Sequence, residues 1–282
     1  MKDSKTRVIK AQETLSIMDS GNYTVNGKNV DIKEDLAASL AGAALYTHDG
    51  FDEVLAGAER KIQTLHCEAK IIVANKTVLQ AAASMAALYE KIGCLNFASA
   101  KNPGGGFING AQAQEESLAV SSSLYGTQIK HQELHQYNRG RHTYLYSDYM
   151  IYSPDVVVFR DDAGELLAEP YKLSMITSPA TNVGAIHNNK PEEMEHVEAT
   201  MLQRMDKMFA LFVAHDIKHL LLGAWGCGVF RNDPKDIARW FAHYLTNGGK
   251  YAKCFETVFF AVYDRSKNED NVNAFRQQFY TL

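Results

Sequence analysis

The sequence predicts an α/β fold in three layers, with helices on both faces of a mixed, mostly parallel sheet. Short apolar runs alternate with helical segments along most of the 282 residues, which is typical of parallel sheets covered on both faces. Two such units stand at 69–90, where an apolar run precedes an Ala-rich helix, and at 92–125, where a glycine loop leads into a helix. Hairpin-like pieces at 23–32 and 149–167 add antiparallel pairs, so we expect a mixed sheet.

The first 60 residues predict a small extension ahead of the main domain. Residues 7–19 fit a helix, and 23–32 alternate around Asn26-Gly27, a strong hairpin signal. Small and apolar residues at 33–47 predict a second helix. We therefore expect an extension over 1–60, packed on a main domain over 61–282.

The later elements follow the same rules. Residues 149–167 predict two strands with a turn at 162–164, and 171–179 a further strand. Pro191 and the acids after it are favoured at a helix start, so 191–214 predicts a long helix. The remaining expected elements are a strand and loop at 218–226, a helix at 234–246, a strand at 255–264 and an amphipathic segment at 271–280 that caps the sheet.

The composition excludes several classes of protein. Hydrophobic residues make up 46% and charged residues 22%, as in a globular protein, and the formal charge of −4 gives no support for general nucleic-acid binding. The four scattered cysteines form no CxxC pair, which predicts reduced thiols in a cytoplasmic protein. The polar first ten residues do not resemble a signal peptide, and no apolar run approaches the roughly 20 residues of a membrane span. We expect no membrane partner, and we take a monomer as the working expectation.

The most informative segment is NPGGGFINGAQAQEE at 102–116. Gly104, Gly105 and Gly106 permit positive φ angles, so the backbone can approach a ligand closely; a tight strand-to-helix turn needs glycine equally well. Glu115 and Glu116 then fall near the start of a helix, where acids also have an ordinary role beside the helix dipole. Adjacent helical positions diverge by about 100°, so the two carboxylates serve different purposes.

A second glycine loop, GAWGCGVFRNDP, occupies 223–234. The amides around Gly226 and Gly228 have the spacing of a turn that can wrap a diphosphate, although a plain strand-to-helix connection explains the loop by itself. It lacks both the Lys-Ser/Thr of a Walker loop and the GxGxxG spacing of a dinucleotide fold. Cys227 has no histidine nearby in sequence, which argues against a nucleophilic thiol.

Taken together, these segments resemble the microbial-type poly(ADP-ribose) glycohydrolases of the macrodomain superfamily. The pattern of GGG followed by QEE carries the resemblance, and RVIKAQETLSIMDSGNY at 7–23 and the 223–234 loop extend it over most of the chain. It implies a macrodomain-like fold and hydrolysis of the ribose–ribose bonds of poly(ADP-ribose), with release of ADP-ribose from the end of the polymer. It implies no cofactor and no metal.

The resemblance also implies roles for particular residues. Glu116 matches the catalytic acid, and Glu115 the glutamate that holds the substrate ribose. The residues expected to bind substrate are Asn102, Gly104, Gly105, Gly106, Gln114, Gly226, Cys227, Gly228, Val229 and Phe230. Phe230 matches an aromatic that packs on the terminal ribose, although the sequence alone assigns it to the core. Several macrodomains carry a sugar-binding asparagine where this chain has Ser99.

Two further groups of residues have competing interpretations. His131, His135 and His142 lie in a polar stretch at 130–142, which we interpret as a solvated loop because the HExxH register of metalloproteases is absent. Arg139 and Arg141 in that stretch are candidates for contact with polymer phosphates. Phe259, Phe260 and Tyr263 end the last strand; one ring is a candidate for stacking on adenine, and core packing is expected for at least two.

Three functions remain open from the sequence. The first is glycohydrolysis of the polymer. The second is release of single ADP-ribosyl groups from protein or another acceptor, and the third is a macrodomain that only binds ADP-ribose. A placed acid/base at Glu116 favours the two enzymes over the binding module.

Overall fold

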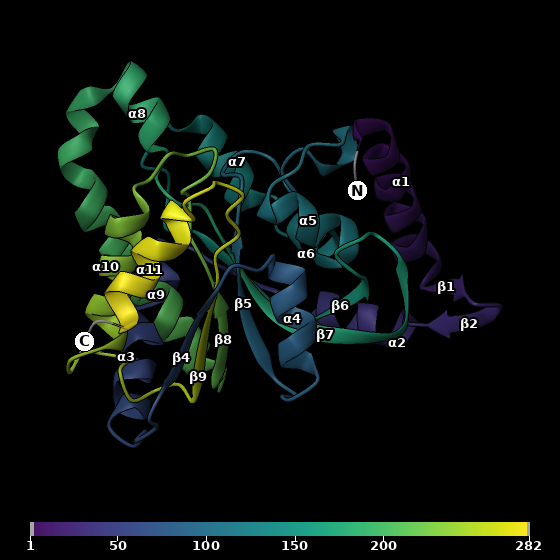
Figure 1. Cartoon of the computed structure of the whole chain (residues 1–282), viewed down its shortest axis with the longest axis horizontal. Coiled ribbons are helices and arrows are strands. Elements are labelled where there is room, and N and C mark those ends of the chain that lie inside the picture. The colour runs from purple at the N-terminus through teal and green to yellow at the C-terminus, as the bar shows by residue number, and fades with distance from the viewer. Residues whose placement is uncertain (1–2, 281–282) are drawn as a thin grey trace.

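A seven-stranded mixed sheet in the order β3-β6-β7-β5-β8-β9-β4 forms the centre of the protein (Figure 1). The computed structural model describes residues 3–280. Strands β7, β5, β8, β9 and β4 are mutually parallel, whereas β6 runs antiparallel to both of its neighbours. The strands of the sheet are β3 (Ala44–Tyr46), β4 (Lys70–Ala74), β5 (Ile92–Phe97), β6 (Met150–Arg160), β7 (Leu166–Ser178), β8 (His219–Leu222) and β9 (Thr257–Ala261).

Helices cover both faces of this sheet, which confirms the three layers. Side chains alternate between the faces along β8, where Leu220 and Leu222 join the larger core and Leu221 the smaller one. The larger core packs under α3 (Phe51–Ile62), α9 (Val197–Ala214), α10 (Pro234–Leu245) and α11 (Asp270–Tyr280). The smaller core packs under α4 (Val78–Ala86), α5 (Gln114–Ser121) and α6 (Leu124–Lys130). Shorter elements are α7 (Glu133–Gly140), α8 (Val183–Asn189) and the 3-10 turns η1 (His48–Gly50), η2 (Phe107–Asn109) and η3 (Pro191–His196).

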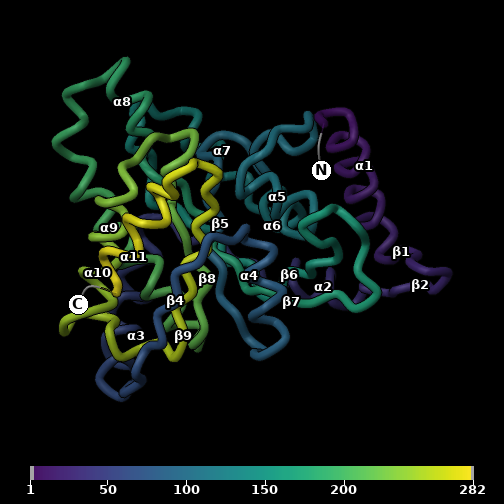
Figure 2. Tube along the Cα trace, in the orientation of Figure 1, coloured from purple at the N-terminus to yellow at the C-terminus, as the bar shows by residue number. Residues whose placement is uncertain are grey.

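The N-terminal segment forms α1 (Ser4–Ser20), the hairpin of β1 (Asn22–Val25) and β2 (Lys28–Asp31), and α2 (Lys33–Gly42). The hairpin turns at Asn26 and Gly27, whose φ angles of 51° and 74° fit the expected tight turn. Figure 2 shows α1 and the hairpin on the side of the molecule opposite the C-terminus. The proposed domain boundary at residue 60 stays a prediction.

The helix expected at 33–47 is wrong over its last five residues. It ends at Gly42, and the next residues form the edge strand β3 against β6. A side chain at Gly42 would meet the Pro154 ring at 2.8 Å, so this glycine lets α2 lie close to β6. The apolar residues after it therefore pair with the sheet instead of extending the helix.

Other expectations need smaller corrections. The strand expected at 171–179 is the end of β7, which starts at Leu166 and continues through Pro170 because pairing with β6 is irregular there. The helix expected from Pro191 begins as the 3-10 turn η3 and becomes α9 at Val197. The expected loop at 130–142 contains α7, and its His135 is fully buried.

Two further observations concern membrane-spanning helices and the state of the cysteines. No helix within residues 3–280 is long and apolar enough to cross a membrane. The four cysteines are free thiols.

Candidate active site

A cleft of about 1230 Å³ opens at the carboxyl ends of β4, β5, β8 and β9, where ligands of open α/β sheets bind. Its walls are the segments that follow those strands, together with α5 and Arg7 of α1. Of the residues expected at the site, Gly104 alone does not line the cleft. It lies under the ring of Phe107 and serves the turn itself. The cleft is lined by the others: Asn102, Gly105, Gly106, Gln114, Glu115, Glu116, Gly226, Cys227, Gly228, Val229 and Phe230.

The glycine loop after β5 brings its backbone against the two carboxylates. Gly104 and Gly105 have φ angles of 65° and 59°, the left-handed region that favours glycine. A Cβ at Gly105 would lie 2.8 Å from Cδ of Glu116 and 3.2 Å from Oε2 of Glu115. The two acids diverge along α5, yet their carboxylates converge on this glycine, which no larger residue can replace without moving them.

Glu116 is half-buried and faces the cleft from the first turn of α5. Its Oε1 accepts a hydrogen bond of 2.9 Å from the backbone amide of Gly106. One carboxylate oxygen is thus fixed by the glycine loop, and the side chain stays in contact with the cleft. A carboxyl held in this way can exchange a proton with a molecule bound in the cleft.

Glu115 is buried and held by three donors. Its Oε1 accepts from Nδ2 of Asn96 (3.1 Å) and Nε2 of Gln128 (2.8 Å), and its Oε2 from the backbone amide of Ser99 (2.6 Å). Burial raises the pKa of Glu115 to about 8, the three hydrogen bonds oppose that rise, and the neighbouring charge of Glu116 adds to it. Glu115 is therefore a fixed carboxyl whose pKa lies well above its ordinary value.

Asn96 and Gln128 are residues that sequence reasoning missed. Both are fully buried, one in β5 and the other in α6. An asparagine inside the apolar run of a buried strand is a weak signal, because a buried polar group needs a partner. Gln128 gives no signal in the sequence, since only the packing of α6 beside α5 brings it to Glu115.

Gln114 connects α5 to β5. Its Oε1 accepts from the amide of Phe97 at 2.9 Å, and its Nε2 donates to the carbonyl of Leu95 at 2.8 Å. Both ends of the amide are used in these bonds. The contacts support a role in positioning the two glutamates that follow it.

The loop after β8 forms the facing wall. Gly226 has a φ of 75°, and a Cβ there would lie 2.6 Å from both Ala180 and the side chain of Asn232. Asn232 donates to the carbonyls of Thr181 (2.8 Å) and Gly226 (3.1 Å), which fixes the loop before α10. Burial raises the pKa of the Cys227 thiol far above its usual value, so this sulfur is a poor nucleophile.

Two of the aromatic rings considered in the sequence analysis, Phe230 and Tyr263, line the cleft. Phe230 is half-buried, lines the cleft and packs against Tyr146 with ring centroids 5.9 Å apart. Phe259 and Phe260 are buried in the core, whereas Tyr263 is half exposed and lines the cleft. Core packing thus accounts for two of the three rings in the last strand, and Tyr263 is the ring available to a base.

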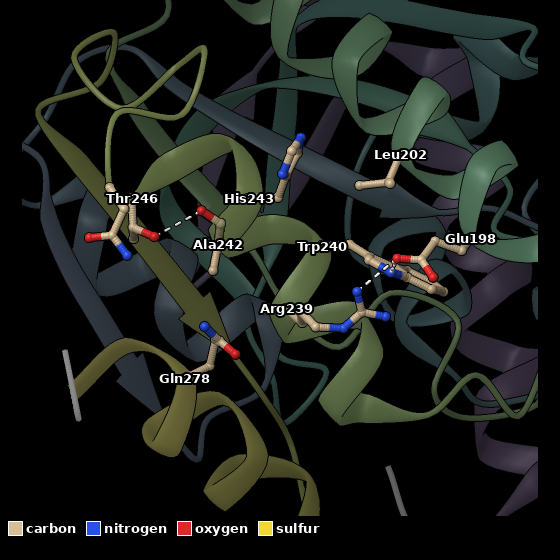
Figure 3. A pocket seen from close by; sticks show the side chains of 9 residues that line it. Glu198, Leu202, Arg239, Trp240, Ala242, His243, Thr246 and Gln278 are labelled. Carbon is tan, nitrogen blue, oxygen red and sulfur yellow. Dashed lines mark hydrogen bonds and ion pairs between the residues drawn. The ribbon is translucent and has the colours of Figure 1, made fainter.

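A second, smaller hollow of about 340 Å³ lies over α9, α10 and the Gln278 side of α11 (Figure 3). Its carboxylate, Glu198, is already bound to Arg239 at 2.7 Å and to the Trp240 indole at 3.0 Å. None of the residues expected at the site lies there. The residues expected at the site, apart from Gly104, line the large cleft instead.

The sheet and the cleft define an α/β protein with two neighbouring carboxyls in a cleft that two glycine loops line. Residues 11–161 match the family model described as microbial-type PARG, catalytic domain, where PARG is poly(ADP-ribose) glycohydrolase. The chain belongs to this family of microbial-type poly(ADP-ribose) glycohydrolases.

Solved structures agree with this assignment. The chain is 40% identical to poly(ADP-ribose) glycohydrolase from Thermomonospora curvata bound to the inhibitor ADP-HPD, over 98% of this chain and 100% of that one, with a TM-score of 0.90. It is 36% identical to the enzyme from Deinococcus radiodurans in complex with ADP-ribose, over 92% of this chain and 99% of that one, with a TM-score of 0.82. No curated protein matches the chain in sequence.

Proposed function

We propose that this protein hydrolyses the ribose–ribose bonds of poly(ADP-ribose) and releases ADP-ribose, with Glu116 as the general acid/base. The observation that carries the proposal is the convergence of Glu115 and Glu116 on Gly105 inside the large cleft. The family assignment and the solved relatives with ADP-ribose or ADP-HPD bound support the same substrate.

The proposed chemistry needs one proton donor at the bond that breaks. Cleavage of the ribosyl C–O bond builds positive charge on the sugar and negative charge on the leaving oxygen. Glu116 donates its proton to that oxygen, and its carboxylate then takes a proton from the attacking water. The scheme requires no metal and no cofactor.

The other residues of the cleft bind and orient the substrate in this proposal. Glu115 accepts a hydrogen bond from a ribose hydroxyl, and Asn102 is a further candidate for a sugar contact. Amides of the 226–230 loop receive the diphosphate, Phe230 packs on the reacting ribose and Tyr263 on the adenine. We propose action from the end of the polymer, by a monomer in the cytoplasm.

Release of single ADP-ribosyl groups from protein is the alternative reaction, because such groups present the same reacting ribose. A module that only binds ADP-ribose would not need a carboxylate fixed by the amide of Gly106.

The variant Glu116→Gln tests the role of the acid. Release of ADP-ribose should fall by about 10²- to 10⁴-fold, while the affinity for ADP-ribose, measured by calorimetry, stays close to wild type. An unchanged rate would remove Glu116 from the mechanism.

A further inference from the structure

Helix α1 is fixed to the catalytic loop by contacts along its length. Ala11 packs in a small core with Phe107 of η2 and with Val120 of α5. Thr14 donates to the carbonyl of Val120, and Nε of Arg7 donates to the carbonyl of Gly110 at 2.6 Å. The guanidinium of Arg7 is thus held in place by the loop that positions the catalytic acid.

Arg7 also contributes one of the few positive charges of the cleft. Its side chain is half-buried and lines the cleft, and the bond to Gly110 uses only one of its N–H donors. Asp3 is the acid one helical turn away, but its carboxylate oxygens accept from the backbone and hydroxyl of Thr6. Of the described residues, the charged ones that line the cleft are Arg7, Glu115, Glu116, Asp162, Asp264 and Arg265.

The two arginines come from elements that lie on different sides of α5. Arg265 follows β9, close to Tyr263, where its guanidinium lies 5.1 Å from the ring centroid. Arg7 binds Gly110 at the end of η2, whereas Glu116 binds Gly106 at the start of η2. In Figure 1, α1 lies beyond α5 on the side away from β8 and β9. Helix α5, whose first turn carries Glu116, therefore lies between α1, which carries Arg7, and the strands whose loops are proposed to bind ADP-ribose.

We propose that Arg7 forms a subsite for a phosphate of the polymer unit behind the bond that is cut. This inference rests on the proposed function, in which the terminal ADP-ribose fills the cleft up to Glu116. The departing group must then leave on the Arg7 side, and in the polymer that group carries a diphosphate. A protein acceptor has no such phosphate, so Arg7 favours the polymer over a single ADP-ribosyl group.

Binding measurements with a one-unit and a two-unit ligand distinguish this subsite from the part of the cleft that is proposed to hold ADP-ribose. The inactive Glu116→Gln protein is titrated with ADP-ribose and with a chain of two ADP-ribose units, with and without Arg7→Gln. Glutamine keeps an N–H donor for Gly110 and removes the charge. Arg7→Gln should weaken the two-unit ligand by about 10- to 100-fold, the usual range for a hydrogen bond to a charged group, and leave ADP-ribose unchanged.

Two further variants and the possible results complete the test. Arg7→Lys, which keeps the charge, should recover part of the affinity, and Arg60→Gln on the exposed face of α3 should change neither ligand. Equal affinity of Arg7→Gln and the parent for the two-unit ligand would overturn the proposal. An equal loss for both ligands would also overturn it, because Arg7 would then only support the loop. Failure of the Glu116→Gln parent to bind either ligand would instead refute the proposed function, and the subsite with it.

Discussion

Gly105→Ala tests whether the close approach of the glycine loop to the acids sets the activity. A normal contact between carbon atoms is about 3.5–4.0 Å, whereas a Cβ at Gly105 would lie 2.8 Å from Cδ of Glu116. The carboxyl of Glu116 must therefore move by roughly 1 Å, a misplacement that typically costs about 100-fold in rate. The positive φ adds a loss of stability of about 1–2 kcal/mol.

The assay is steady-state release of ADP-ribose, with thermal unfolding measured in parallel. Gly248→Ala is the matched control, because Gly248 has a φ of 77° and no atom lies within 4 Å of a Cβ there. Both variants should lose the stability that the positive φ costs, and only Gly105→Ala should lose activity. A rate for Gly105→Ala within about threefold of wild type, or an equal loss of activity in the control, would refute this reasoning.

Three other predictions concern the pKa of Glu115 and the proposed contact of Tyr263 with adenine. The pKa of Glu115 is higher in the folded state than in the unfolded chain. The protonated carboxyl therefore stabilises the folded state fully at pH values below the ordinary pKa of glutamate, and this contribution is lost as pH rises through about 8. Glu115→Gln should therefore gain stability over wild type in urea unfolding as pH rises from 5 to 9, and a constant difference would contradict this. Gln128→Met removes a donor to the carboxylate and should raise the pKa of Glu115 further, measured by carbon-13 NMR of labelled glutamate; an unmoved titration would show that the contact is only structural. Tyr263→Ala should weaken ADP-ribose binding by about 10- to 100-fold through lost stacking, with Tyr263→Phe as control, and wild-type affinity would place the adenine elsewhere.

Local patterns in the sequence predicted most of the fold. Asn26-Gly27 marks its hairpin turn because both residues tolerate positive φ, and alternating apolar runs identify the strands of the sheet. Edge strand β3 was missed because its three residues carry no pattern that separates them from the end of α2. Helix α7 was missed because the sequence around His135 is polar, and the burial of His135 depends on neighbours distant in the chain.

In the site too, contiguous motifs could be predicted from the sequence, whereas contacts between separate elements could not. Glycines followed by two acids form a contiguous motif, so sequence and resemblance together located Glu115, Glu116 and the loop that faces them. The supports of Glu115 come from β5 and α6, and Arg7 comes from α1. Contacts between separate elements leave no spacing rule in the sequence, so only the structure reveals them.

The central claim is best tested by measuring ADP-ribose release from two substrates side by side, with Glu116→Gln as control. One substrate is poly(ADP-ribose) and the other a panel of proteins carrying single ADP-ribosyl groups. We predict release of ADP-ribose from the polymer, lost in Glu116→Gln, and little from the single groups. Release from the single groups alone would move the function to removal of protein ADP-ribosylation, and binding without release from either substrate would contradict the account.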